Sequence, residues 1–407
     1  MKKKLLSAVL VLTMSATLFA GCGSTDTETT ETTETTDATE TTDATESTDG
    51  ASAEGTLKIG GIGPTTGDAA VYGQAVENAA QLAVDEINAA GGVNGMMLEL
   101  NFQDDEADAE KAVNAYNTLK DWDMQVLMGT VTSTACIAVA EKTAEDNVFQ
   151  LTPSGSAIEC ITHDNAFRVC FSDPNQGKAS AQYIGENSLA TKVAVIYDSS
   201  SVYSTGIYET FVAEAANQGI EVVAAEAFTA DSNKDFTVQL QKAKDSGAEL
   251  LFLPIYYNEA ALILAQAKTI SFAPTFFGCD GLDGILAVEN FDTSLAEGVM
   301  LLTPFAADAQ DEATQNFVTA YNEKFGGTPN QFAADAYDAI YIIKAAAEKA
   351  GITADMSASD ICDALKTAMT EITVDGLTGS GMTWTADGEP NKAPKAVKIV
   401  NGVYTAM

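Results

Sequence analysis

Residues 59–95 constrain the fold most, because a buried-strand pattern changes there to a helical pattern across a glycine-rich loop. The strand is apolar at Leu57, Ile59 and Ile62. Pro64 ends it, since proline lacks a backbone donor and fixes φ. A helix predicted from Gly73 onward has one apolar face, made by Val76, Ala80, Ala83 and Ile87. This is a strand–loop–helix unit of an α/β fold, and such sheets bind ligands at the carboxyl ends of their strands.

The loop after this strand does not have the spacing of a nucleotide-binding motif. Gly61, Gly63 and Gly67 do not match G-x-G-x-x-G, and Pro64 removes an amide that a pyrophosphate would need. The Gly177-Lys178 pair is followed by alanine, so it is not a P-loop either. We therefore expect neither a dinucleotide nor a nucleoside triphosphate at this site.

The first 21 residues have the pattern of a signal peptide. Three lysines precede an apolar run over residues 5–18, which is too short and too early for a membrane span. The Ala-Gly pair before Cys22 resembles the lipobox of bacterial lipoproteins, in which this cysteine becomes the lipidated first residue. Two or more acyl chains would anchor the protein stably. We therefore expect a lipoprotein attached to the outer face of the cell membrane.

Residues 22–55 are predicted to be a disordered tether after the lipidated cysteine. Threonine and acidic residues dominate this segment, which contains no aromatic and no large aliphatic residue. Such a composition cannot bury a hydrophobic core. The segment would let the folded part move above the membrane, although an inert spacer would look much the same.

The folded part is strongly acidic. Ten of the 58 acidic residues lie in residues 26–54 and three of the 21 basic residues lie in the signal peptide, so residues 55–407 carry 18 basic and 48 acidic side chains, a net charge of −30. Nucleic acid is therefore not an expected partner. The acidity favours solubility and does not identify a small ligand.

Cysteine and histidine usage excludes most metal and catalytic sites. Five cysteines follow Cys22 without zinc-like spacing. Cys160 could pair with Cys170 or with Cys136, or all five could be buried thiols, and the sequence leaves these alternatives open. His163 is the only histidine. We therefore expect no metal, no cofactor and no enzymatic activity.

The remaining sequence alternates strand-like and helical patterns, which predicts parallel sheets flanked by helices. Strand-like runs lie at residues 125–128, 148–151, 192–197, 220–228, 249–253, 274–277 and 298–302. One seam falls at residues 172–174 and another at residues 303–304, before a helix-rich segment. Two α/β lobes joined by more than one connection would leave a cleft between strand ends, suited to a hinge.

An ordered set of motifs over residues 56–403 resembles the leucine/isoleucine/valine-binding proteins that supply ABC importers. The motifs are Gly63-Pro64, Thr66-Gly67, Tyr72-Gly73, AVDEINAAGGVNG at residues 83–95, Gly129-Thr130, Thr152-Pro153-Ser154, Phe167-Arg168, Gln176-Gly177, Tyr197-Asp198, Tyr256-Tyr257, Asp280-Gly281 and AYDA at residues 336–339. The resemblance implies a type 1 periplasmic-binding fold with two lobes and three crossovers. Lobe 1 would comprise residues 56–172 and 304–374, and lobe 2 residues 173–303 and 375–407.

The resemblance also implies which residues hold the carboxylate of a free amino acid. Ser133 matches the family's serine, which resembles a helix N-cap and acts with nearby amides. A helix N-terminus offers free N–H groups and a favourable dipole to an anion. Ser156 stands where threonine is usual, and Ser154 lies beside it.

By the same resemblance, Asp280 pairs with the α-ammonium group, a charge-assisted interaction. Tyr72, Tyr203 and Tyr256 match aromatic positions around the side-chain pocket, where rigid rings exclude water. The family frequently has glutamate at the position of Asp280 and usually threonine at the position of Ser156. We expect these two departures to change which ligand side chain is preferred, but not the binding of amino acids as a class.

The expected function is that of an extracytoplasmic substrate-binding protein of an ABC importer. A monomer would close its two lobes on a branched-chain or similar aliphatic amino acid and then present a surface to the permease subunits. Two alternatives stay open: a ligand-sensing domain for a receptor, and binding of a small amide, urea or an aromatic acid.

Overall fold

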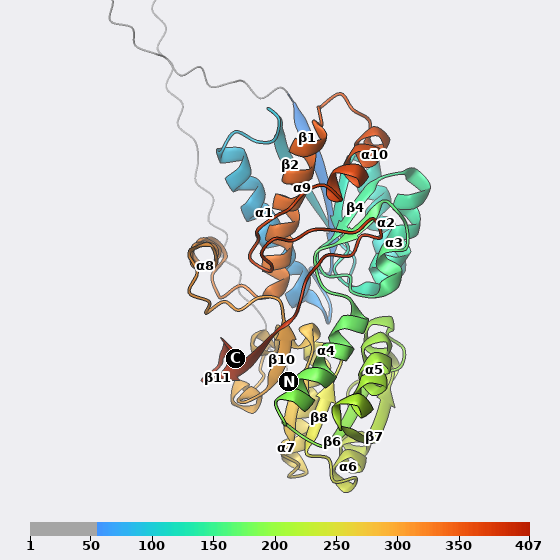
Figure 1. Cartoon of the computed structure of the whole chain (residues 1–407), viewed down its shortest axis with the longest axis vertical. Coiled ribbons are helices and arrows are strands. Elements are labelled where there is room, and N and C mark those ends of the chain that lie inside the picture. The colour runs from blue at the N-terminus through green and yellow to red at the C-terminus, as the bar shows by residue number, and fades with distance from the viewer. Residues whose placement is uncertain (1–54) are drawn as a thin grey trace, which may run out of the picture. The chain divides into compact units, whose positions relative to one another are not determined.

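A computed structural model of the protein describes residues 55–407. The predicted signal peptide, the lipidated Cys22 and nearly all of the tether lie in residues 1–54, outside the described residues. The described chain forms two sheets, each flanked by helices (Figure 1). We refer to the elements around the first sheet as lobe 1 and to those around the second as lobe 2. No helix in residues 55–407 combines the length and the apolar character that a membrane span requires.

Lobe 1 contains a five-stranded sheet in which every strand pair is parallel. Its strands are β1 (Thr56–Gly63), β2 (Met97–Asp104), β3 (Val126–Gly129), β4 (Phe149–Thr152) and β5 (Ala166–Arg168), in the order β2-β1-β3-β4-β5. The connecting helices are α1 (Ala70–Ala89), α2 (Ala109–Asp121), α3 (Ser133–Asp146) and the short η1 (Ile158–Ile161). The predicted apolar face of α1 is confirmed, because Val76, Ala80, Ala83 and Ile87 are all buried.

Lobe 2 contains a seven-stranded sheet with parallel and antiparallel strands. Its order is β12-β11-β10-β9-β8-β6-β7. The strands are β6 (Lys192–Asp198), β7 (Glu221–Phe228), β8 (Leu250–Leu253), β9 (Thr275–Gly278), β10 (Met300–Thr303), β11 (Lys395–Val400) and β12 (Val403–Ala406). Pairing is parallel from β7 to β10 and antiparallel from β10 to β12. The flanking helices are α4 (Asp173–Glu186), α5 (Val202–Ala215), α6 (Thr237–Asp245) and α7 (Tyr257–Thr269).

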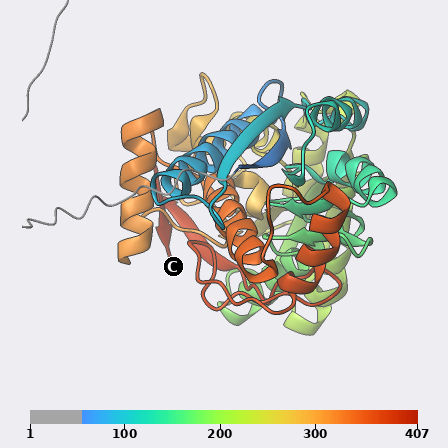
Figure 2. The same cartoon turned by 90° about the horizontal axis from the view of Figure 1, so that it is seen from above.

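The chain returns to lobe 1 after β10 through α8 (Glu312–Phe325), α9 (Gln331–Ala350) and α10 (Ala358–Met369). Helix α9 packs alongside α1, as the view from above shows in blue and orange (Figure 2), and α10 lies against β3 and β4. Residues 375–392, which we assigned to lobe 2 from the sequence, contact lobe 1 instead. The Trp384 indole donates to the Arg168 carbonyl (2.8 Å), so this segment is held at the β5 edge before the chain enters β11.

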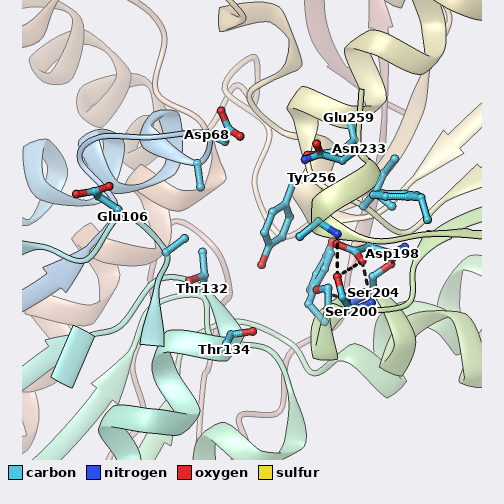
Figure 3. A pocket seen from close by; sticks show the side chains of 17 residues that line it. Asp68, Glu106, Thr132, Thr134, Asp198, Ser200, Ser204, Asn233, Tyr256 and Glu259 are labelled. Atoms are coloured by element: carbon cyan, nitrogen blue, oxygen red, sulfur yellow. Dashed lines mark hydrogen bonds between the residues drawn. The ribbon is translucent and has the colours of Figure 1, made fainter. Parts of the chain in front are cut away.

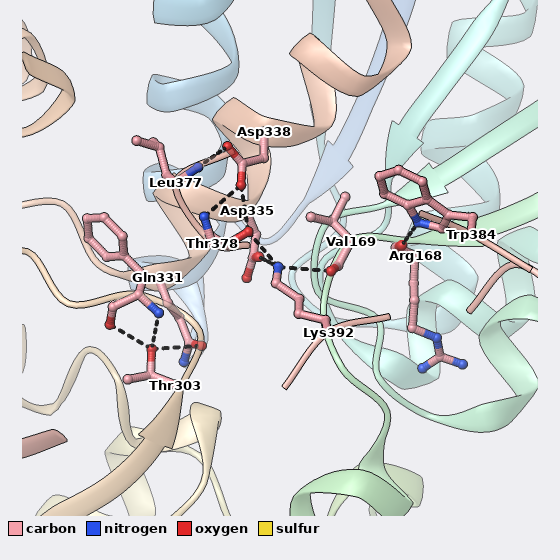
Figure 4. Close-up of polar contacts among 11 residues, drawn as sticks. Arg168, Val169, Thr303, Gln331, Asp335, Asp338, Leu377, Thr378, Trp384 and Lys392 are labelled. Carbon is pink, nitrogen blue, oxygen red and sulfur yellow. Dashed lines mark hydrogen bonds and ion pairs between the residues drawn. The ribbon is translucent and has the colours of Figure 1, made fainter. Parts of the chain in front are cut away.

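One buried lysine forms hydrogen bonds with several of the segments that connect the lobes (Figure 4). The Lys392 ammonium donates to the Val169 carbonyl (2.9 Å), to Asp335 Oδ1 (2.7 Å) and to Thr378 Oγ1 (2.5 Å). Val169 follows β5 at the first crossover, Lys392 precedes β11 at the third, and Asp335 belongs to α9. Because an uncompensated charge is very unfavourable in a protein interior, this ion pair holds the three segments in one arrangement.

Lys392→Ala should lower the free energy of unfolding by about 3–5 kcal/mol, because it leaves the Asp335 carboxylate buried without its partner. Lys349→Ala is the control, because it removes a solvent-exposed pair with Glu371 and should cost less than about 1 kcal/mol. Urea unfolding followed by circular dichroism measures both. A cost for Lys392→Ala no larger than the control would contradict the proposed role of this ion pair.

Candidate functional site

A small cavity lies between the lobes and brings together all seven residues that the sequence predicted for the site. It is lined by Tyr72, Val131, Thr132, Ser133, Ser154, Ser156, Tyr203, Tyr256, Asp280, Gly281 and Phe332. Its volume is about 10 Å³, which is room for roughly one water molecule. A larger ligand therefore requires the lobes to separate and close again around it.

The lobe 1 wall begins at the N-terminus of α3. Thr132, with extended backbone angles, is the N-cap residue, and Ser133 is the first helical residue. The sequence comparison had suggested a cap role for Ser133. The Ser133 hydroxyl instead accepts a hydrogen bond from the Ala157 amide (3.2 Å), which ties α3 to the loop after β4. The N-terminus of α3 borders the cavity through Thr132 and Ser133, and a helix N-terminus favours an anion.

The loop after β4, residues 154–157, completes this wall. The Ser154 hydroxyl donates to the Val131 carbonyl (2.7 Å), and the Gly155 amide donates to Thr152 Oγ1 (2.7 Å). Both bonds hold the loop against the strand ends of the first sheet. Ser156 is almost completely buried, and its backbone amide has no protein acceptor among residues 55–407. Lobe 1 therefore offers hydroxyl and amide groups that suit a carboxylate.

The lobe 2 wall is centred on Asp280, in the short helix η4 (Asp280–Leu282) after β9. Its carboxylate accepts a hydrogen bond from the Tyr203 hydroxyl (2.6 Å), and its amide donates to Gln176 Oε1 (3.2 Å). Burial raises the pKa of Asp280 to about 6, although the hydrogen bond from the Tyr203 hydroxyl favours the charged form. No lysine or arginine forms an ion pair with this carboxylate within residues 55–407.

Aromatic rings from both lobes enclose the cavity. The Tyr72 hydroxyl donates to the Gly281 carbonyl across the cleft (2.5 Å). The Tyr72 ring lies 4.1 Å from Phe332 and 5.4 Å from Tyr256, between ring centroids. Gly281 is needed here because a Cβ would come within 2.6 Å of the Tyr203 oxygen. These contacts join lobe 1 to lobe 2 across the cavity.

Sequence reasoning missed two residues of this region. Phe332 lines the cavity from the first turn of α9, which only the return of the chain to lobe 1 places beside α1. Asp173 lies in the predicted seam at residues 172–174, to which no ligand role was given. It is buried in the first turn of α4, neither of its carboxylate oxygens has a hydrogen-bond partner, and its amide donates to the Ser156 carbonyl (2.9 Å). Burial raises the pKa of this carboxyl well above its usual value.

A second, wider cavity of about 250 Å³ forms the entrance to the cleft (Figure 3). It shares Thr132, Tyr203 and Tyr256 with the inner cavity. Acidic side chains from both lobes line it: Asp68 and Glu106 from lobe 1, Asp198 and Glu259 from lobe 2. Their charges disfavour the entry of solutes with a net negative charge.

The cysteines and the histidine of residues 55–407 do not line either cavity. In residues 55–407, no three histidine, cysteine or acidic side chains are placed to hold a metal ion. The five cysteines of this range are buried free thiols, so neither pairing considered for Cys160 is formed. His163 faces Glu141 at 3.1 Å, away from the cavity.

Comparison with known proteins agrees with this geometry. Residues 56–402 match the family model described as periplasmic binding protein. The chain is 30% identical over 312 residues to a Leu/Ile/Val-binding protein homolog of Brucella melitensis, covering 76% of this chain and 83% of the relative. It is 30% identical over 301 residues to a leucine-, isoleucine-, valine-, threonine- and alanine-binding protein of Pseudomonas aeruginosa, covering 74% and 80%.

Solved structures show the same fold. The branched-chain amino acid transporter substrate-binding protein LivJ of Streptococcus pneumoniae, in complex with isoleucine, superposes with a TM-score of 0.79 at 30% identity, covering 86% of this chain and 98% of that one. The leucine-binding protein LivK of Thermotoga maritima gives 0.77 at 26% identity, covering 86% and 97%.

Two α/β lobes that enclose a polar cavity between their strand ends define a bilobal ligand-binding protein. With the family match over residues 56–402, the chain belongs to the periplasmic binding protein family. The predicted fold class is confirmed, and so is the resemblance to the branched-chain amino-acid binding proteins.

Tyr203→Phe should raise the pKa of Asp280 further above 6, because it removes a hydrogen bond that stabilises the ionised carboxylate. Tyr197→Phe is the control, since Tyr197 stacks on Tyr208 and does not line the cavity. The carboxyl carbon resonance of Asp280, assigned with Asp280→Asn and followed by NMR against pH, measures the shift. A titration midpoint of Asp280 near pH 4 in the unchanged protein would contradict the raised pKa.

Proposed function

We propose that this protein binds a free amino acid with an aliphatic side chain and delivers it to an ABC importer. One observation carries the proposal: hydroxyl and amide groups of lobe 1 and the buried carboxylate of Asp280 in lobe 2 face the same cavity. Such an arrangement complements the two opposite charges that every free amino acid carries.

The α-carboxylate would bind at the N-terminus of α3, with the Ser133 hydroxyl and the Ser156 amide as donors. Oriented amides and the helix dipole stabilise an anion there without a nearby lysine. The α-ammonium would form an ion pair with Asp280. Inside a closed cleft, solvent and salt screen the attraction between these two charges only weakly. Ser154 also lines the cavity and completes the polar wall.

The side chain of the ligand would contact the rings of Tyr72, Tyr256 and Phe332, while Tyr203 holds Asp280 in place. Rigid rings remove apolar surface from water with little loss of side-chain entropy. The relatives and solved structures whose names specify leucine, isoleucine or valine support a branched-chain ligand.

Closure would follow from contacts that form only when the lobes meet, because a ligand shifts a conformational equilibrium only through its difference in affinity. The closed form would dock on a permease. The lipobox-like sequence at Cys22 and the acidic tether support a lipoprotein on the outer face of the membrane. A receptor-linked sensor would bind ligand equally well, and adjacent permease and ATPase genes would distinguish the importer.

Leucine, isoleucine or valine should raise the melting temperature of the protein more than other amino acids do. A ligand at 100 times its Kd adds about 2.7 kcal/mol to the free energy of unfolding. A thermal-shift panel of the twenty amino acids measures this, with urea, short amides and aromatic acids included as competing ligand classes. A response only to benzoate-like acids or to amides would contradict the proposal.

Asp280→Asn should weaken binding of the preferred amino acid by more than about tenfold, because losing the partner of a buried charge commonly costs about 2 kcal/mol or more. Asp198→Asn is the matched control. It removes a carboxylate of the same lobe that lines only the outer cavity, and Kd should change by less than about threefold. Isothermal calorimetry at pH 7.5 measures both, and equal effects would show a general charge effect rather than ammonium pairing.

A further inference from the structure

The Arg168 side chain is the largest of the fully buried side chains, and it lies directly behind the loop that lines the cavity. Arg168 ends β5, and its backbone carbonyl accepts from the Trp384 indole (Figure 4). Its guanidinium belongs to neither cavity lining, so it does not contact the space where we place the ligand. Arg168 can therefore affect ligand binding only through the backbone groups to which its guanidinium donates hydrogen bonds.

The guanidinium donates hydrogen bonds to three successive backbone carbonyls. Nη1 donates to the carbonyls of Gly155 (3.3 Å) and Ser156 (2.5 Å), and Nη2 donates to that of Ala157 (3.1 Å). Because the peptide N–H points opposite to its C=O, the amides of Ser156 and Ala157 are turned away from Arg168. The Ala157 amide donates to the Ser133 hydroxyl, and the Ser156 amide has no protein acceptor among residues 55–407.

The orientation of Arg168 is set in turn by a neighbouring hairpin. Its Nε lies 3.0 Å from Glu389 Oε2, and Glu389 is one-third exposed while Arg168 is buried. The Arg168 amide donates to the Gly388 carbonyl (3.1 Å). Gly388 has φ +78°, and a Cβ there would come within 2.3 Å of the Ala166 carbonyl, so only glycine lets the hairpin reach this edge.

The geometry assigns Arg168 as the positioning residue of the anion-binding loop: its guanidinium turns the Ser156 amide toward the ligand carboxylate and the Ala157 amide toward the Ser133 hydroxyl, and Glu389 holds the guanidinium in that orientation. This inference rests on the proposed function, because it names how one part of that site is built. A planar fork with five donors can satisfy three carbonyls and one carboxylate at once, whereas an ammonium cannot reproduce that geometry.

A purely structural role would predict equal effects on every ligand, and the positioning role does not. Arg168→Lys keeps the charge but cannot hold three carbonyls. It should weaken leucine binding by more than about tenfold, whereas binding of leucinamide, which lacks the carboxylate, should change by less than about threefold. Calorimetry with both compounds measures this difference in the full chain.

Hydrogen–deuterium exchange without ligand provides an independent readout. In Arg168→Lys the amides of a peptide spanning residues 154–161 should exchange faster than in the unchanged protein, while peptides from lobe 2 should not change. If Arg168→Lys does not fold, Glu389→Ala takes its place, since this side chain is at the surface, with Glu371→Ala as the control for removing an exposed acid.

Equal weakening of leucine and leucinamide binding would overturn the inference, and so would unchanged exchange over residues 154–161 in a folded variant. If the unchanged protein binds no amino acid at all, the proposed function fails. The exchange experiment then decides by itself whether Arg168 orients the loop.

Discussion

The buried carboxylate of Asp280 is the constraint on which the arrangement of the cleft depends. It has no basic partner in the described chain, and the hydrogen bond to the carboxylate comes from the Tyr203 hydroxyl. A charged group held in this way is unfavourable unless a cation completes the site. In the function that we propose, the α-ammonium group of the ligand would supply that cation, and the buried carboxylate would favour amino acids over uncharged or anionic ligands.

The remainder of the structure keeps this carboxylate opposite its counterpart in lobe 1. Lys392 joins the first and third crossovers to α9, while Gln331 at the start of α9 donates to the Asp280 carbonyl (2.8 Å). The loop that faces Asp280 is itself held from behind by Arg168 and Glu389. Both buried cations therefore act on backbone near the crossovers, where small changes in orientation move one lobe relative to the other.

Much of the site could be predicted from sequence, because its residues follow recognisable strand ends and family motifs. Ser133, Ser154, Ser156 and Asp280 each lie just after a strand that pairs in parallel with its neighbours, where α/β folds place ligand contacts. Phe332 could not be predicted in the same way, since nothing local distinguishes its ring from those buried elsewhere in the core. The crossing near residue 392 was also missed, because residues 375–392 lack regular elements that would reveal the lobe they contact.

The sequence by itself determined the alternation of strands and helices, the two-lobed fold and the residues with the chemistry to hold an amino acid. Periodicity and motif spacing are local properties, so they can be recognised along one dimension. Only the tertiary structure decided that the Ser133 hydroxyl bonds to Ala157 rather than capping α3, that the five cysteines of residues 55–407 stay unpaired, and that Arg168 and Glu389 meet. Such pairings depend on the distance between chain segments after folding, which no local pattern records.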